Sequence, residues 1–159
     1  MTAIEYTLEE ISYSRKEDRR IMESVLRNWF NDPKALNFFS PGSKYPFNFK
    51  KWVQMHYSIN SINIATIVLK QNEWVIGHVS LKTKKEGTEL LHLFIDSEYR
   101  GKGLGLRLLK ETESYIIDPK IESITAKVQK KNIVLKKFLE KSGYRYKSSN
   151  QNMMIKRLE

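Results

Sequence analysis

A short glycine-rich segment carries the clearest chemical signal in this sequence. Residues 100 to 105 read Arg100-Gly101-Lys102-Gly103-Leu104-Gly105, between an apolar run and a stretch with helical periodicity. At a strand-to-helix turn, unpaired backbone N–H groups and the positive end of the helix dipole face an anion. The glycines let the backbone approach a ligand closely, and Arg100 and Lys102 add positive charge. The segment therefore predicts a phosphate-binding turn, the alternative being a connection that binds nothing.

Two common phosphate-binding patterns do not fit this turn. A Walker motif needs Gly-Lys-Ser/Thr after four intervening residues, and the segment has no such tripeptide. In the Rossmann motif the third glycine follows the second by three residues, whereas Gly105 follows Gly103 by two. A phosphate bound at this turn would therefore belong to neither a Walker nor a Rossmann site.

The elements before the turn are expected to be one strand, two helices and an antiparallel meander. A strand near residues 4–8 precedes a helix, for which Ser14 and Glu17 have capping-box spacing. The dipeptide Asp32-Pro33 marks the end of that helix. Residues 37–48 are aromatic and turn-rich and read as a loop over a pocket. A short helix near residues 49–57 and three β-rich runs follow: residues 63–70, 74–84 and 88–96.

After the turn, the sequence predicts helix, strand, helix and a closing hairpin. The first helix has one apolar face and is stopped by Asp118-Pro119. The later elements are a strand at 121–128, a helix at 132–142 capped by Gly143, and strands at 144–147 and 153–158. This order predicts an α+β fold, with a central mixed, mostly antiparallel twisted sheet flanked by about four helices. No repeat or linker divides residues 1–159, so one domain is expected.

Composition narrows the classes of function. The chain has 159 residues, no cysteine, and 28 Lys and Arg against 18 Asp and Glu, for a net charge of +10. Disulfides and a thiol nucleophile are excluded, and the charge favours anionic partners. The N-terminus lacks the pattern of a signal peptide, and no run is long enough to span a membrane. We expect a cytoplasmic protein, monomeric or homodimeric, with no membrane partner.

The turn resembles a known family motif. Arg100-x-x-Gly103-x-Gly105 is similar to the Gln/Arg-x-x-Gly-x-Gly/Ala signature of the GNAT N-acetyltransferases. A second segment, Asn132 followed eleven residues later by Gly143-Tyr144, resembles another conserved stretch of these enzymes. The family order of elements covers essentially the whole chain. The resemblance implies the GNAT fold and transfer of an acetyl group from acetyl-CoA, as cosubstrate, to a primary amine.

The resemblance also implies which residues hold the cosubstrate. Backbone N–H groups of Gly101, Lys102, Gly103, Leu104 and Gly105 would bind the diphosphate of CoA. The backbone of residues 93–95, which are Leu93, Phe94 and Ile95, would pair with the pantetheine arm. Asn132 would contact the cosubstrate, although an Asn at this place is equally suited to cap the helix that follows. No metal is expected, and His56 and His78 read as structural residues.

An amine attacks a thioester only as the free base, so the reaction needs a proton acceptor. Glu89 occupies the place of the general-base glutamate in the histone-acetylating members of the family, and His92 is the alternative acceptor. Strand alternation puts Glu89 and His92 on opposite faces unless a bulge intervenes. A solvated strand end for Glu89 and a core histidine for His92 are the structural alternatives.

One position departs from the family pattern. The tyrosine that usually protonates the departing thiolate would fall seven residues after Asn132, where this chain has Leu139. General acid assistance typically contributes about 10²–10⁴ in rate, so its absence points to another donor, to solvent, or to a slower enzyme. It also keeps open a catalytically inactive sensor that binds CoA.

The basic residues allow a third function class, a nucleic-acid-binding module. Aromatic residues are not interleaved among the lysines, which makes nucleic acid the least favoured partner. The basic charge also disfavours polycationic acceptors and favours a peptide N-terminus or a neutral or acidic small molecule. The acceptor pocket is expected to use Phe38, Phe39, Tyr45, Phe47 and Trp52, the alternative being that these residues belong to the core. The lysines that would form the nucleic-acid-binding surface are Lys82, Lys84, Lys85, Lys127, Lys130, Lys131, Lys136 and Lys137.

Overall fold

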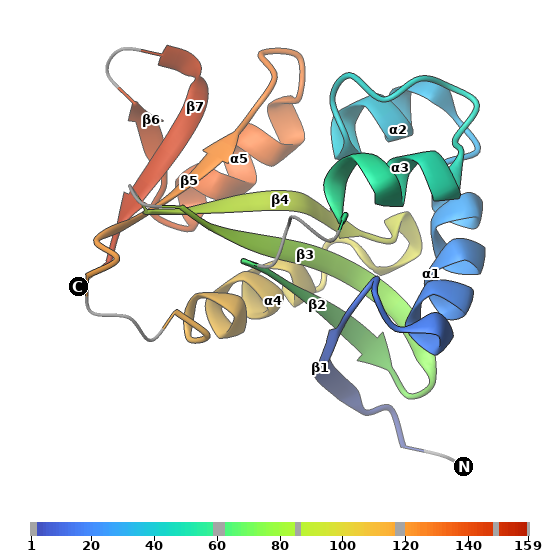
Figure 1. Cartoon of the computed structure of the whole chain (residues 1–159). Coiled ribbons are helices and arrows are strands. Elements are labelled where there is room, and N and C mark those ends of the chain that lie inside the picture. The colour runs from blue at the N-terminus through green and yellow to red at the C-terminus, as the bar shows by residue number, and fades with distance from the viewer. Residues whose placement is uncertain (1–2, 59–62, 85–86, 117–119, 148–149, 159) are drawn as a thin grey trace.

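A computed structural model gives the fold, and it describes residues 3–58, 63–84, 87–116, 120–147 and 150–158 (Figure 1). Five α-helices and seven strands are present in these residues, with a short 3₁₀ turn, Ser97–Tyr99, before the glycine segment. The helices are α1 (Lys16–Trp29), α2 (Pro33–Phe39), α3 (Phe49–His56), α4 (Leu104–Glu113) and α5 (Ile133–Lys141). The strands are β1 (Tyr6–Ile11), β2 (Ile64–Gln71), β3 (Trp74–Lys84), β4 (Gly87–Ile95), β5 (Ser123–Lys127), β6 (Arg145–Lys147) and β7 (Asn150–Arg157).

The strands form one mixed sheet with the order β1-β2-β3-β4-β5-β7-β6. Only the β4–β5 pair is parallel, and the other neighbours are antiparallel. A parallel pair needs a crossover, which α4 provides between β4 and β5. The predicted α+β class with a mostly antiparallel sheet is confirmed, with five helices in place of about four.

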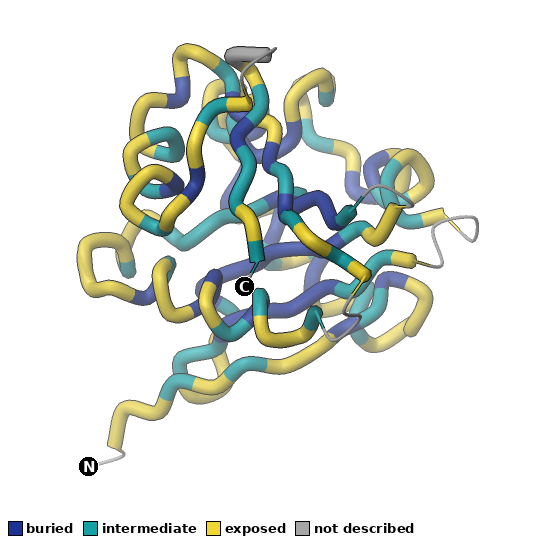
Figure 2. Tube along the Cα trace, turned by 90° about the vertical axis from the view of Figure 1, so that its left-hand side faces the viewer, coloured by how far each residue is buried: buried dark blue, intermediate teal, exposed yellow. Residues whose placement is uncertain are grey.

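The sheet separates two hydrophobic cores. On one face, α4 and α5 pack through Leu104, Leu108 and Leu139 against the central strands. On the other face, α1, α2 and α3 enclose an aromatic core that includes Phe39 and Trp52 (Figure 1). Burial is concentrated on the central strands and on the inner faces of the helices (Figure 2). The sheet is therefore covered on both faces around β4, which leads into the glycine segment.

The second helix was missed by sequence reasoning. Helix α1 does end just before Asp32-Pro33, at Trp29, as expected, but the same two residues also begin α2. The Asp32 side chain accepts a hydrogen bond from the N–H of Ala35, and Pro33 is the first helical residue. Asp at the N-cap followed by Pro is a favoured helix start, so the signal was present. The predicted loop over the pocket is correspondingly shorter, because residues 37–39 are helical.

Two other helix boundaries differ from expectation. The capping box at Ser14 does not form: Arg15 is the N-cap of α1, without a side-chain hydrogen bond, and the Ser14 hydroxyl bonds to Ser12. Helix α4 ends at Glu113, before the expected stop at Asp118-Pro119, which lies outside the described residues. The hydroxyls of Thr112 and Ser114 bond to carbonyls one turn back, and such bonds compete with helix continuation.

No helix in the described parts of the chain is long and apolar enough to cross a membrane.

Candidate active site

The site lies where β4 and β5 separate. Their parallel pairing comprises three residue pairs and ends at Leu90 opposite Ala126, although β4 continues to Ile95. Beyond Leu90, the edge of β4 that faces β5 therefore has no partner strand. Unpaired strand edges are templates for another extended chain. A cavity of about 860 Å³ occupies this region.

A β-bulge in β4 changes which side chains face the cavity. His78 pairs with Phe94 and Ser80 pairs with Leu91, so His92 and Leu93 both lie opposite Val79. His92 takes a φ of 52°, which is uncommon for a residue other than glycine. Bulges of this kind reverse the alternation of side chains along the strand.

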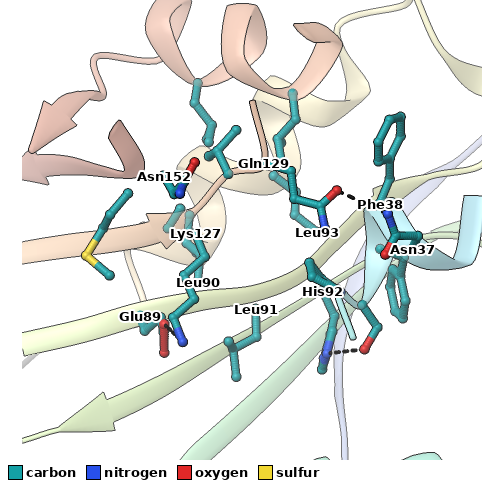
Figure 3. Close-up of a pocket in the computed structure, with 18 of the residues that line it drawn as sticks. Asn37, Phe38, Glu89, Leu90, Leu91, His92, Leu93, Lys127, Gln129 and Asn152 are labelled. Carbon is teal, nitrogen blue, oxygen red and sulfur yellow. Dashed lines mark hydrogen bonds and ion pairs between the residues drawn. The ribbon is translucent and has the colours of Figure 1, made fainter. Parts of the chain in front are cut away.

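Because of the bulge, Glu89 and His92 lie on the same face of the sheet. This corrects the expectation from simple alternation, which placed them on opposite faces. Both residues line the cavity with Leu91 between them (Figure 3). The bulge is fixed by tertiary contacts: the His92 carbonyl accepts a 2.8 Å hydrogen bond from Nδ1 of His78.

The glycine turn has the geometry expected of an anion site. Gly101 and Gly103 have φ values of 79° and 76°, in the left-handed region where a side chain is disfavoured. Gly103 is the N-cap of α4 and no side chain caps the helix. The first N–H groups of α4 thus have no intrahelical partner. A Cβ built at either glycine meets no atom within 4 Å, so the approach to the turn is open.

Three other residues of the turn behave differently from the sequence interpretation. Gly105 is needed for packing: an added Cβ would lie 3.2 Å from the Phe138 ring of α5. The guanidinium of Arg100 donates to the Ile95 carbonyl at 2.8 Å and lies over the Phe94 ring. The ammonium of Lys102 lies over the ring of Tyr99. Arg100 therefore supports the end of β4, and the open part of the turn is its backbone.

Glu89 is a buried carboxylate in the cavity wall. The residue is 3% exposed, and its Oε1 accepts from the ammonium of Lys84 at 2.9 Å. The ammonium of Lys127 is 3.9 Å from Oε2, and the two side chains point toward one another (Figure 3). Oε2 has no hydrogen-bond partner among the described residues. A buried carboxylate oxygen without a hydrogen bond is costly, so a ligand donor is expected there.

His92 is held in a hydrogen-bonded aromatic cluster. Its Nδ1 is 2.7 Å from the Tyr57 hydroxyl, its Nε2 is 3.4 Å from the Ser40 hydroxyl, and the ring stacks on Phe39. Burial, together with repulsion from His56 and His78, lowers the pKa of His92 well below its usual value. His92 is therefore neutral at physiological pH, and both ring nitrogens already have partners.

His78 supports the cluster from β3. Since its Nδ1 donates to the His92 carbonyl, its Nε2 accepts from the Tyr13 hydroxyl at 2.9 Å. Burial lowers the pKa of His78 to about 4. The bond that Nε2 accepts from Tyr13 requires the neutral imidazole, so protonation of His78 removes it while Nδ1 still donates.

These neutral histidines predict a loss of stability in mild acid. Below the ordinary histidine pKa of ~6.5, the unfolded chain binds protons that folded His78 refuses until about pH 4, so the free energy of unfolding falls as pH falls. For His78 alone the loss from pH 7 to pH 5 should be about 2 kcal/mol, and His92 acts in the same direction. Urea unfolding at both pH values measures it. The variant His78→Gln should reduce the pH dependence of the free energy of unfolding by the contribution of one proton. An unchanged slope would contradict the assignment to His78.

Leu139 lines the cavity on the α5 side, whereas Asn132 is not part of the lining. Asn132 caps α5, because its side chain accepts a hydrogen bond from the N–H of Leu135 at 3.2 Å. The cofactor contact implied by the family resemblance stays a prediction. Leu139 is fully buried and lines the cavity, so its position offers an apolar wall and no proton donor.

Sequence reasoning missed several residues of the site. His56 was read as structural, yet it is half-buried in the cavity wall, where burial and the charge of Lys82 lower its pKa. Of the lysines considered for the least favoured function, a nucleic-acid surface, five line the cavity instead: Lys82, Lys84, Lys127, Lys130 and Lys131. Lys85 of that group lies outside the described residues. Once the strand register is known, the pairing of Lys82 with Glu89 across β3 and β4 indicates that this lysine lies beside the carboxylate.

Two of the five expected aromatic residues line the cavity. Phe38 and Phe39 do so from α2, next to an exposed hydrogen bond of 3.2 Å from Asn37 to Gln129 of the β5–α5 loop (Figure 3). Tyr45, Phe47 and Trp52 are not part of the lining. Phe47 and Trp52 instead belong to the aromatic core beneath it.

A family model described as "Acetyltransferase (GNAT) family" matches residues 20–144, which include the bulged strand, the glycine turn and Asn132. The chain belongs to the GNAT acetyltransferase family. Its members with known structure include the PaiA N-acetyltransferase of Thermoplasma acidophilum in complex with coenzyme A. That structure has 22% identity and a TM-score of 0.72, over 97% of this chain and 99% of that one. The family and fold predicted from the sequence are confirmed.

Two further solved structures resemble this GNAT acetyltransferase over nearly its whole length. An acetyltransferase from Thermus thermophilus has 19% identity and a TM-score of 0.73, over 96% of this chain and 97% of that one. A chimera of the spermidine N-acetyltransferase SpeG from Vibrio cholerae has 16% identity and a TM-score of 0.69, over 96% and 95%. Identities this low establish the shared fold only. No curated protein sequence matches this chain.

Proposed function

We propose that this GNAT protein transfers an acetyl group from acetyl-CoA to a primary amine by direct attack. The observation that carries the proposal is the separation of β4 from β5 after Leu90. It leaves an unpaired strand edge that leads from the buried carboxylate of Glu89 to the open N–H groups of the glycine turn. A pantetheine thioester is an extended chain with amide groups and a diphosphate at one end. The unpaired edge of β4 fits the extended pantetheine chain, and the glycine turn fits the diphosphate at its end.

The residues of the turn and of β4 would hold the cosubstrate. The N–H groups at the start of α4, near Gly103, would bind the diphosphate through hydrogen bonds and the helix dipole. The backbone of Leu93, Phe94 and Ile95 would pair with the pantetheine amides. An N–H near Phe94 would stabilise the negative charge that develops on the thioester oxygen. The bound cosubstrate supplies an activated acetyl group and a thiolate leaving group.

Glu89 is the proton acceptor that the geometry favours. The amine must lose a proton before or during attack, and Oε2 of Glu89 is a buried acceptor without a hydrogen-bond partner among the described residues. The carboxylate accepts the proton directly or through one water. His92, in contrast, has both ring nitrogens within a hydrogen-bonded cluster and positions the bulge. We assign His92 a positioning role.

The leaving group needs little assistance from the protein. Leu139 offers no hydroxyl at the family position of the acid. A thiol has a pKa near ~8.5, so the thiolate is a stable enough anion to leave and take a proton from solvent. We therefore propose an enzyme that operates without a tyrosine acid at this position.

Two measurements test the proposal. Calorimetry with acetyl-CoA should show binding at a single site, and thiol release should require an added amine. Binding without thiol release across a broad panel of amines would identify the CoA-binding sensor instead. Absence of acetyl-CoA binding would refute both readings. A cytoplasmic location and a monomeric or homodimeric state remain predictions for the same preparation.

A further inference from the structure

The acceptor end of the cavity is unusually cationic. Three lysines from two strands, Lys82, Lys84 and Lys127, line the wall around Glu89. Lys82 pairs with Glu89 across the strands β3 and β4, and the ammonium groups of Lys84 and Lys127 lie 2.9 and 3.9 Å from its carboxylate. Glu89 is the only acidic residue in the described lining. One carboxylate cannot neutralise three ammonium groups.

These lysines lie too far from the glycine turn to bind the diphosphate of CoA. Six residue steps along β4 separate Glu89 from Ile95, which corresponds to about 20 Å of extended strand. Beyond Ile95, the 3₁₀ turn intervenes before Gly103. The positive charge at Glu89 is therefore left for the second substrate.

These lysines line the cavity from its solvent-facing rim, since the side chains of Lys84 and Lys127 are 45% and 68% exposed. Lys82 is half-buried, and its charge contributes to the lowered pKa of His56, which also lines the cavity. The ammonium of Lys84 lies 2.9 Å from Oε1 of Glu89 and that of Lys127 lies 3.9 Å from Oε2, which has no hydrogen-bond partner among the described residues. An occupant of this position meets a hydrogen-bond acceptor and a set of cations at short range.

We propose that the acceptor is a small amine with a carboxylate close to its amino group, as in a free amino acid. The amino group donates to Oε2 of Glu89, and the carboxylate lies against the ammonium groups of Lys82 and Lys127. Because the Lys127 ammonium lies 3.9 Å from Oε2, an amino group at Oε2 and a carboxylate at Lys127 fit within one small molecule. Polyamines, which carry only positive charge, are repelled by the same lysines. This inference rests on the proposed acetyl transfer and names the acceptor class of the same site.

Matched acceptors test the inference through thiol release from acetyl-CoA. A panel of amino acids is compared with the corresponding amino acid amides, which keep the amine and lose the carboxylate. We expect kcat/KM at least about 10-fold higher for the acids. Spermidine and short peptides with free N-termini complete the panel, and both should be poorer acceptors than the best amino acid.

Variants of the lysines give the second arm of the test. Lys82→Gln and Lys127→Gln should each raise KM for the best amino acid about 10-fold, with little change for its amide. The matched control is Lys110→Gln, on the exposed side of α4, which should leave both acceptors unchanged. This split between acid and amide would not arise from a general loss of stability.

The outcomes separate the inference from the proposed function. Equal or better use of the amides or spermidine, with active transfer, would overturn the inference and leave acetyl transfer intact. Preference for peptides over free amino acids would also overturn it. Bound acetyl-CoA with no thiol release for any amine would refute the transfer itself and the inference with it.

Discussion

Replacement of Glu89 by Gln is expected to lower kcat for acetyl transfer by about 10²–10⁴-fold at neutral pH. The substitution keeps the size of the side chain and an oxygen that can accept from Lys84, but it removes the ability to take a proton. Glu89 is 3% exposed and the only acidic residue in the described cavity lining, so no neighbouring carboxylate replaces it. Steady-state kinetics with a saturating amine measures the effect, and calorimetry should show unchanged affinity for CoA.

The control for this prediction is His92→Asn. The Asn amide can reproduce the hydrogen bond from the position of Nδ1 to the Tyr57 hydroxyl, while the contact of Nε2 with Ser40 is lost. We expect lower thermal stability and a change in kcat of less than about tenfold. The reverse pattern, with Glu89→Gln active and His92→Asn inactive, would assign the proton acceptor to His92.

Replacement of Gly103 by Asp should raise the Kd for CoA at least about 100-fold, a loss of about 2.7 kcal/mol. An added side chain meets no atom within 4 Å, and Asp is one of the residues that tolerate a positive φ. At the N-cap of α4 the carboxylate would accept from the N–H groups that the diphosphate needs. The carboxylate also repels the diphosphate. The repulsion energy of two like unit charges 5 Å apart is about 3 kcal/mol at an effective dielectric constant of ~20.

Gly103→Asn separates charge from shape in this experiment. Asn caps the same N–H groups and tolerates the same backbone angle, but it carries no charge, so its effect on the Kd for CoA should be about tenfold smaller. Thermal unfolding should show both variants folded, because capping offsets the backbone strain. If Gly103→Asp binds CoA like the unchanged protein, the turn is not the diphosphate site.

Local patterns in the sequence were sufficient for most of the elements and for the turn. The alternation and apolar runs of residues 63–96 gave the meander, and the glycine spacing at 100–105 gave the family. These features depend on the backbone preferences and periodicity of neighbouring residues, which a sequence displays directly. The start of α2 at Pro33 was missed for the same local reason, because a proline is compatible with the end of one helix and the start of the next.

The sequence by itself determined the fold class, the family and the position of the glycine turn, because each depends on residues close together in the chain. Only the tertiary structure decided which side chains share the cavity. The bulge that turns His92 toward the face of Glu89 is fixed by His78, fourteen residues away. The cluster of Lys82, Lys84 and Lys127 around one carboxylate depends on strand register. Register arises from packing between distant segments, which no local pattern contains.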